Sequence, residues 1–204
     1  ERVKQTAGPR KVQAQVQLGE LYEDRLDDLE KASVQYEAAL AQDESQLDAL
    51  KGLERIYARQ GNHQELLQVL ERELEVLPTP RQKIAVLERI GAIQEEEFVS
   101  PEKAIEAYEQ VVAIDPGHEH ASPALARLYR QVSRFDDLVE VLEQHARATT
   151  DDGRKVDLLV QAARTLMRDV GSPERAIEIC DRVLDIEPGN VEALGLQARL
   201  KAQL

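Results

Sequence analysis

Residue types that carry enzymatic chemistry are sparse in this chain of 204 residues. The segment His118-Glu119-His120 holds two imidazoles and a carboxylate, but no further His or Cys stands at the spacing of a zinc site. Cys180 is the single thiol, and we find no glycine-rich phosphate loop, nucleophile elbow or Ser/His/Asp arrangement. The sequence therefore predicts a protein that is not an enzyme and that uses no metal or cofactor.

Arginine offers a different chemistry, because its planar guanidinium can hold a carboxylate through two parallel hydrogen bonds. The chain as a whole is acidic, with a net charge of −13. An acidic surface disfavours binding to phosphate backbones, so nucleic acid is not an expected partner. No apolar run approaches the roughly 18 residues of a membrane span, and no signal peptide is visible. Together with the single cysteine, these features lead us to expect a cytoplasmic protein without membrane partners.

The elements that would position such side chains recur along the chain. Residues 100–118 (SPEKAIEAYEQVVAIDPGH) and 172–190 (SPERAIEICDRVLDIEPGN) are identical at 10 of 19 positions and lie 72 residues apart. Related anchor residues step by 34, 38, 34 and 38 residues, at Ala32, Leu66, Ala104, Leu138 and Ala176. Apolar residues follow each anchor after four and eight positions, which indicates one amphipathic helix per anchor. Cys180 stands in this stripe, so we interpret it as a buried packing residue.

A second helix is expected upstream of each anchored helix. The upstream segments at residues 18–22, 53–57 and 125–129 align with one another, with the same residue types at corresponding positions. Ser100 and Ser172, each followed by Pro, are expected to cap the anchored helices. Gly117 and Gly189 are expected to end them in left-handed geometry after a Pro. Each unit is therefore predicted to be helix, turn, helix.

Three motifs, Leu18-Gly19-x-x-Tyr22, Ala32-x-x-x-Tyr36 and Ala104-x-x-x-Tyr108, resemble the tetratricopeptide repeat signature. Proline at positions 78, 116 and 188 adds to the resemblance, which covers nearly the whole chain. It implies an all-α, right-handed α-solenoid of five helix-turn-helix repeats plus a final helix, about 11 helices in total. The expected repeats are 8–45, 46–78, 79–117, 118–150 and 151–189, with the final helix at 190–204, in a single domain, 1–204.

The chain departs from the family pattern at several points. Leu66 and Leu138 replace the small residue that is usual at the anchor, and Glu54 occupies another site that is usually small. Residues 1–7 match the end of a preceding second helix, and 190–204 match a lone first helix. We therefore expect a fragment of a longer array, or an array that this final helix closes. Repeats rich in Glu, Arg and Leu also resemble those of bacterial arrays.

The resemblance implies that the first helices line a concave groove that receives a peptide or a partner helix. The candidate partner-binding residues on these helices are Arg55, Arg59, Arg127, Arg130, Arg164, Arg168 and Arg199. We hypothesise that Arg127, Arg130, Arg164 and Arg168 receive an acidic segment or a C-terminal carboxylate. Alternatively, these arginines pair with Glu95, Glu96 or other neighbours within the array.

Three functions fit these observations. The first is a non-catalytic protein–protein interaction scaffold that binds a protein or peptide ligand. The second is a structural or self-assembly module within a larger multidomain protein, of unknown oligomeric state. The third is a part of an enzyme whose catalytic domain lies outside this sequence. His145, in the middle of a predicted helix, is assigned a structural or surface role.

Overall fold

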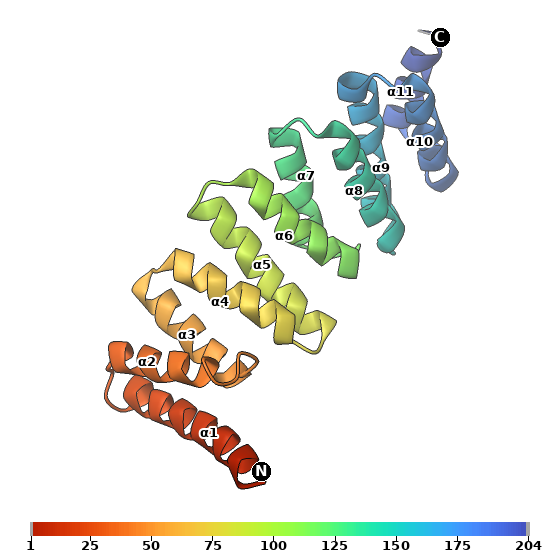
Figure 1. Ribbon diagram of the computed structural model, residues 1–204. Helices are drawn as coiled ribbons and strands as arrows, with labels where there is room; N and C mark the ends of the chain where they lie inside the picture. The colour runs from red at the N-terminus through yellow and green to blue at the C-terminus, as the bar shows by residue number, and fades with distance from the viewer. Residues whose placement is uncertain (1, 203–204) are drawn as a thin grey trace. The chain divides into compact units, whose positions relative to one another are not determined.

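The computed structural model describes residues 2–202, and side chains from residue 8 onward (Figure 1). Within these residues it contains eleven α-helices, one π-helical segment and no strand, so the predicted all-α class and number of helices are confirmed. The elements are α1 Arg2–Asp24, α2 Leu29–Leu40, α3 Leu47–Gln60, α4 His63–Val76, α5 Pro80–Glu96, α6 Pro101–Ile114, α7 Ala121–Gln131, α8 Phe135–Ala148, α9 Asp152–Thr165, η1 Leu166–Val170, α10 Pro173–Ile186 and α11 Val191–Lys201.

Contacts divide the chain into two compact units, one ending at Glu97 and the other beginning at Phe98. We call them the N-terminal and C-terminal units. In each unit, helices that follow one another in the chain pack together. Helices further apart in the chain that also make contact are separated by one α-helix, as in α1 with α3 and α9 with α11. Such local packing is the arrangement of stacked repeats, in which each hairpin buries its apolar face against its neighbours.

One residue with a left-handed backbone marks the turn within each repeat. These residues are Asp27, Gly61, Val99, Ser133 and Gly171, and they are spaced alternately by 34 and 38 residues. The predicted left-handed geometry of Gly117 and Gly189 is wrong. The helices before them end at Asp115 and Glu187, and neither Gly117 nor Gly189 has a positive φ.

Two predicted helix ends need correction. Ser100 and Ser172 are the N-cap residues of α6 and α10, each followed by Pro, but their side chains make no capping hydrogen bond. Asp28, the N-cap residue of α2, does accept such a capping hydrogen bond, from the backbone N–H of Lys31.

Helix α1 runs without a break through Pro9, so residues 2–7 do not form the end of a separate helix. A proline is tolerated in a helix when the loss of one backbone hydrogen bond is offset elsewhere.

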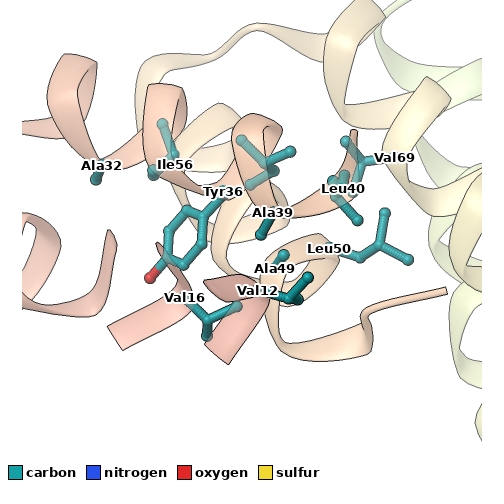
Figure 2. Close-up of a cluster of buried hydrophobic side chains, with 11 residues drawn as sticks. Val12, Val16, Ala32, Tyr36, Ala39, Leu40, Ala49, Leu50, Ile56 and Val69 are labelled. Carbon is teal, nitrogen blue, oxygen red and sulfur yellow. The ribbon is translucent and has the colours of Figure 1, made fainter. Parts of the chain in front are cut away.

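The core of the N-terminal unit is built around Tyr36 of α2 (Figure 2). Its ring is fully buried and lies against two helical glycines, Gly19 of α1 and Gly52 of α3. A Cβ atom added to Gly52 would lie 2.4 Å from two ring carbons, and one added to Gly19 would lie 2.7 Å from a ring carbon. The two glycines therefore provide the space in which three helices meet around one aromatic ring.

Candidate functional site

In the N-terminal unit, Arg55 is held by an acid from the neighbouring repeat. Its Nε and one terminal nitrogen each donate a hydrogen bond of 2.8 Å to the two oxygens of Glu23. Glu23 is only 7% exposed and also accepts a 2.8 Å hydrogen bond from the hydroxyl of Tyr36. Burial raises the pKa of Glu23, but the hydrogen bonds from Arg55 and Tyr36 outweigh it and hold the pKa below its usual range.

Arg59 is paired in a similar way one turn further along α3. Its guanidinium lies 2.9 Å from a carboxylate oxygen of Asp27, in the turn between α1 and α2. Both predicted arginines of the N-terminal unit are therefore engaged by acids of the same unit, and a ligand would have to compete with these acids.

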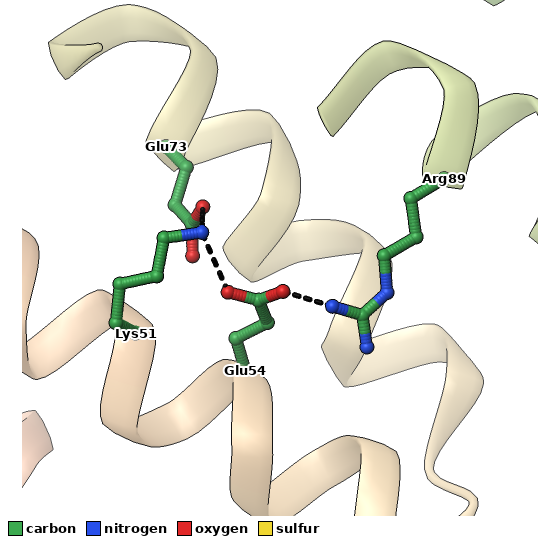
Figure 3. Close-up of polar contacts among 4 residues, drawn as sticks. All are labelled: Lys51, Glu54, Glu73 and Arg89. Carbon is green, nitrogen blue, oxygen red and sulfur yellow. Dashed lines mark hydrogen bonds and ion pairs between the residues drawn. The ribbon is translucent and has the colours of Figure 1, made fainter. Parts of the chain in front are cut away.

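A partly buried charge cluster joins α3, α4 and α5 (Figure 3). The ammonium of Lys51 lies 2.7 Å from an oxygen of Glu54 and 2.5 Å from an oxygen of Glu73, and Arg89 contacts the other oxygen of Glu54. Glu54, which replaces a usually small residue, is thus compensated by two cations. Glu73 is fully buried, and burial together with the nearby charge of Glu54 raises its pKa to about 7, although Lys51 opposes the rise.

Glu73 is a buried acid that was not predicted, although the sequence contains a signal for its burial. Glu73 stands seven residues after the anchor Leu66, which places both residues on the same face of α4. Leu66 is buried, so Glu73 is buried as well.

Replacing Glu73 with Gln is expected to make the protein more stable at alkaline pH and to leave its stability at acidic pH nearly unchanged. Because the folded-state pKa lies above the usual 4.5, the folded state binds more protons between about pH 4.5 and 7. The free energy of unfolding of the natural chain should therefore fall as pH rises through this window. Glutamine stays neutral, so at about pH 8 we expect a gain on the order of 2 kcal/mol in urea denaturation.

The control for this prediction is Glu75→Gln, an exposed position on the same helix, which should change stability little at either pH. If Glu73→Gln is instead less stable than the natural chain at alkaline pH, the ion pair with Lys51 outweighs the burial of the charge.

The C-terminal unit contains three adjoining clefts along its first helices. The first cleft lies between α7, α8 and α9, and it shares Arg130 and Gln161 with the second. The second shares Arg164 and Arg168 with the third, which extends to Arg199 on α11. The clefts have volumes of about 260, 360 and 380 Å3. We call this row of clefts the C-terminal groove.

The structure places all five predicted arginines of this unit along the C-terminal groove. Arg164 is paired with Glu192 of α11, and Arg127 also has a partner. Arg130, Arg168 and Arg199 form no ion pair or hydrogen bond through their side chains with any residue that the structure describes. Three exposed guanidinium groups are thus available in one groove of an acidic protein.

The other candidate residues have structural positions. Cys180 is fully buried in α10, as predicted, and burial raises the pKa of its thiol, which lowers its reactivity. The Nδ1 atom of His118 accepts a 3.3 Å hydrogen bond from the backbone N–H of Ala121. Among the described residues, no group of three or more His, Cys, Asp or Glu side chains could hold a metal ion. None of the described helices combines the length and apolar composition of a bilayer crossing.

Comparisons with known proteins agree with the hairpin architecture. The family model described as tetratricopeptide repeat matches residues 49–84 and 124–156, which cover most of α3–α4 and of α7–α8. The anaphase-promoting complex subunit 7 of Arabidopsis thaliana is 29% identical over 161 residues, which make up 78% of this chain. The match spans only 27% of that relative's length.

Two solved structures are also similar. A tetratricopeptide repeat protein from Parabacteroides merdae is 19% identical with a TM-score of 0.49, and the match covers 94% of this chain and 72% of that one. YrrB, a repeat protein with an unusual peptide-binding site, is 19% identical with a TM-score of 0.46, and the match covers 90% of each chain. Two segments of this chain thus match the tetratricopeptide repeat model, and each lies on a pair of helices that pack together as a hairpin.

Proposed function

We propose that this protein is a non-catalytic scaffold that binds an acidic segment of a protein partner in the C-terminal groove. The observation that carries the proposal is the row of unpaired arginines, Arg130, Arg168 and Arg199, in adjoining clefts. Each guanidinium can hold a carboxylate through two parallel hydrogen bonds. Arg127 and Arg164 line the same groove, but each already has a partner within the protein.

Charge supports the choice of an acidic ligand. The chain has a net charge of −13, so an exposed concentration of arginine stands out from an otherwise acidic molecule. Such a groove attracts an acidic segment and repels basic ones, which favours selectivity and rapid association. The Arabidopsis relative is itself a subunit of a protein complex, which agrees with a role in binding other proteins.

Arg55 and Arg59 are secondary candidates in this proposal. Each is already paired, with Glu23 and Asp27 respectively. If a ligand carboxylate displaced Glu23 or Asp27, one ion pair would replace another, and binding would gain little free energy. We therefore place the ligand on the C-terminal unit.

Reversing the charge of two unpaired arginines tests the proposal. The probe is a fluorescein-labelled decapeptide of alternating glutamate and glycine, and its binding is followed by fluorescence anisotropy at low and physiological salt. We expect the double variant Arg130→Glu, Arg168→Glu to bind at least about tenfold more weakly, because attraction at two positions becomes repulsion. Binding to the natural chain should weaken with salt.

The matched control is the double variant Lys103→Glu, Arg147→Glu. Both residues are exposed on second helices of the C-terminal unit and lie outside the three clefts. This control changes the net charge by the same amount and should bind almost normally. Equal weakening in both double variants would mean that net charge, rather than the groove, governs binding, and would overturn the proposal. So would a folded natural chain that does not bind the peptide.

A further inference from the structure

One largely buried polar side chain of the C-terminal groove has no hydrogen-bonding partner among the described residues. His145 of α8 is 4% exposed and lines the cleft between α7, α8 and α9. Its ring forms no hydrogen bond with any residue among those that the structure describes. The ring nitrogens of His145 are not among the fully buried unsatisfied atoms of the described residues, so they open onto the cleft and are available to a ligand.

The cleft around His145 combines apolar walls with positive charge. Val141, Leu142 and Leu158 provide apolar surface. The charged residues that line the cleft are Arg127, Arg130 and Arg154, and none of its lining residues is Asp or Glu. The volume of about 260 Å3 is suited to one side chain rather than to a longer stretch of peptide. A ligand side chain that complements this surface has a short apolar stem and ends in an anionic group.

We propose that the His145 cleft is the anchor subsite of the C-terminal groove and receives one Asp or Glu side chain of the bound segment. The methylene groups of that side chain pack against Val141, Leu142 and Leu158. Its carboxylate accepts a hydrogen bond from the imidazole and faces the guanidinium groups of the cleft. This inference rests on the proposed function, since it specifies how the groove holds an acidic segment.

Such a subsite couples binding to protonation. Burial lowers the pKa of His145, the charge of Arg154 lowers it further, and Glu119 raises it. Arg127 and Arg130 of α7 line the same cleft. The free imidazole is therefore neutral at neutral pH. A carboxylate in contact with it favours the imidazolium and raises the pKa of His145 on binding. The complex then takes up a proton, and affinity rises as the pH falls.

Calorimetric titration with the alternating glutamate–glycine decapeptide tests the subsite. Titrations in two buffers of different ionisation enthalpy, at about pH 6.5, give the number of protons taken up. We expect the natural chain to take up a fraction of one proton and to bind at least about threefold more tightly at about pH 5.5 than at about pH 7.5. His145→Gln should abolish the uptake and the pH dependence, while it keeps salt-sensitive binding through the arginines.

His120→Gln is the matched control, because His120 is exposed and lines none of the three clefts of the groove. It should leave proton uptake unchanged. Proton uptake that persists in His145→Gln would overturn the subsite. Absence of uptake by the natural chain would also overturn it, and this measurement does not depend on the folding of any variant. In both cases the peptide still binds, whereas the proposed function fails if the natural chain does not bind the peptide or if both charge-reversed double variants bind it equally weakly.

Discussion

Valine in place of Gly52 is expected to reduce the free energy of unfolding of the N-terminal unit by about 3 kcal/mol. The Cβ atom alone would lie 2.4 Å from two carbons of the Tyr36 ring, well inside van der Waals contact. Tyr36 cannot move away freely, because it is fully buried and its hydroxyl is bonded to Glu23. The gain in helix propensity from removing a glycine, below about 1 kcal/mol, is too small to offset this overlap. Urea denaturation followed by circular dichroism measures the effect.

Two further variants distinguish the steric overlap with the Tyr36 ring from the general effect of placing valine in a helix. Gly195→Val lies within α11, where no other atom is within 4 Å of the added Cβ, and it should change stability little. In a chain that already carries Tyr36→Leu, the effect of Gly52→Val should fall below about 1 kcal/mol, because the ring is gone. If the effect of Gly52→Val is as large without the ring as with it, contact with Tyr36 is not its cause.

A second large effect is expected in the C-terminal unit for Ala176→Arg. Ala176 is fully buried in α10, which packs on α9, and Ala162 and Ala163 of α9 are buried as well. A long cationic side chain at this position must either push the helices apart or bury a charge. We expect a loss of about 3 kcal/mol or more in urea denaturation, with a matching fall in melting temperature.

The control is Glu178→Arg, two residues further along α10 and exposed. It introduces the same side chain on the same helix and should alter stability by less than about 0.5 kcal/mol. An unchanged melting temperature for Ala176→Arg would mean that α10 does not pack through its anchor residue, and the repeat frame would then be incorrect.

The helices could be predicted from the sequence because their signals are local. A stripe of apolar residues at helical spacing depends only on residues a few positions apart, and the stripe repeats five times. The burial of anchors such as Leu66 and Leu138 follows from the same stripe. Even these larger anchors, which depart from the family pattern, occupy buried positions.

The partners of the charged residues could not be predicted in the same way. Arg55 meets Glu23 across 32 positions of the chain, and Arg89 meets Glu54 across 35. Long side chains reach over a neighbouring helix in several directions, so sequence spacing alone does not select one acid among many. The open cleft at His145 is a further example, since it forms between three helices and no single helix contains its signal.

The left-handed turn residues were also beyond the sequence analysis. Gly61 and Gly171 are the residue type that such a backbone favours, but Asp27, Val99 and Ser133 are not. At Asp27 and Ser133 the helices on either side of the turn pack together and fix its geometry. A β-branched residue such as Val99 is strained there, and its backbone conformation is set by the fold rather than by its own preference.

Contacts confined to neighbouring helices have a consequence for the speed of folding. The mean separation in sequence between touching residues stays small in each unit, and chains of such low contact order fold rapidly. No distant ends of the chain have to meet before a stable nucleus exists. Folding can therefore begin at any hairpin whose apolar stripe is intact and spread outward, and a defect introduced in one unit should delay the other very little.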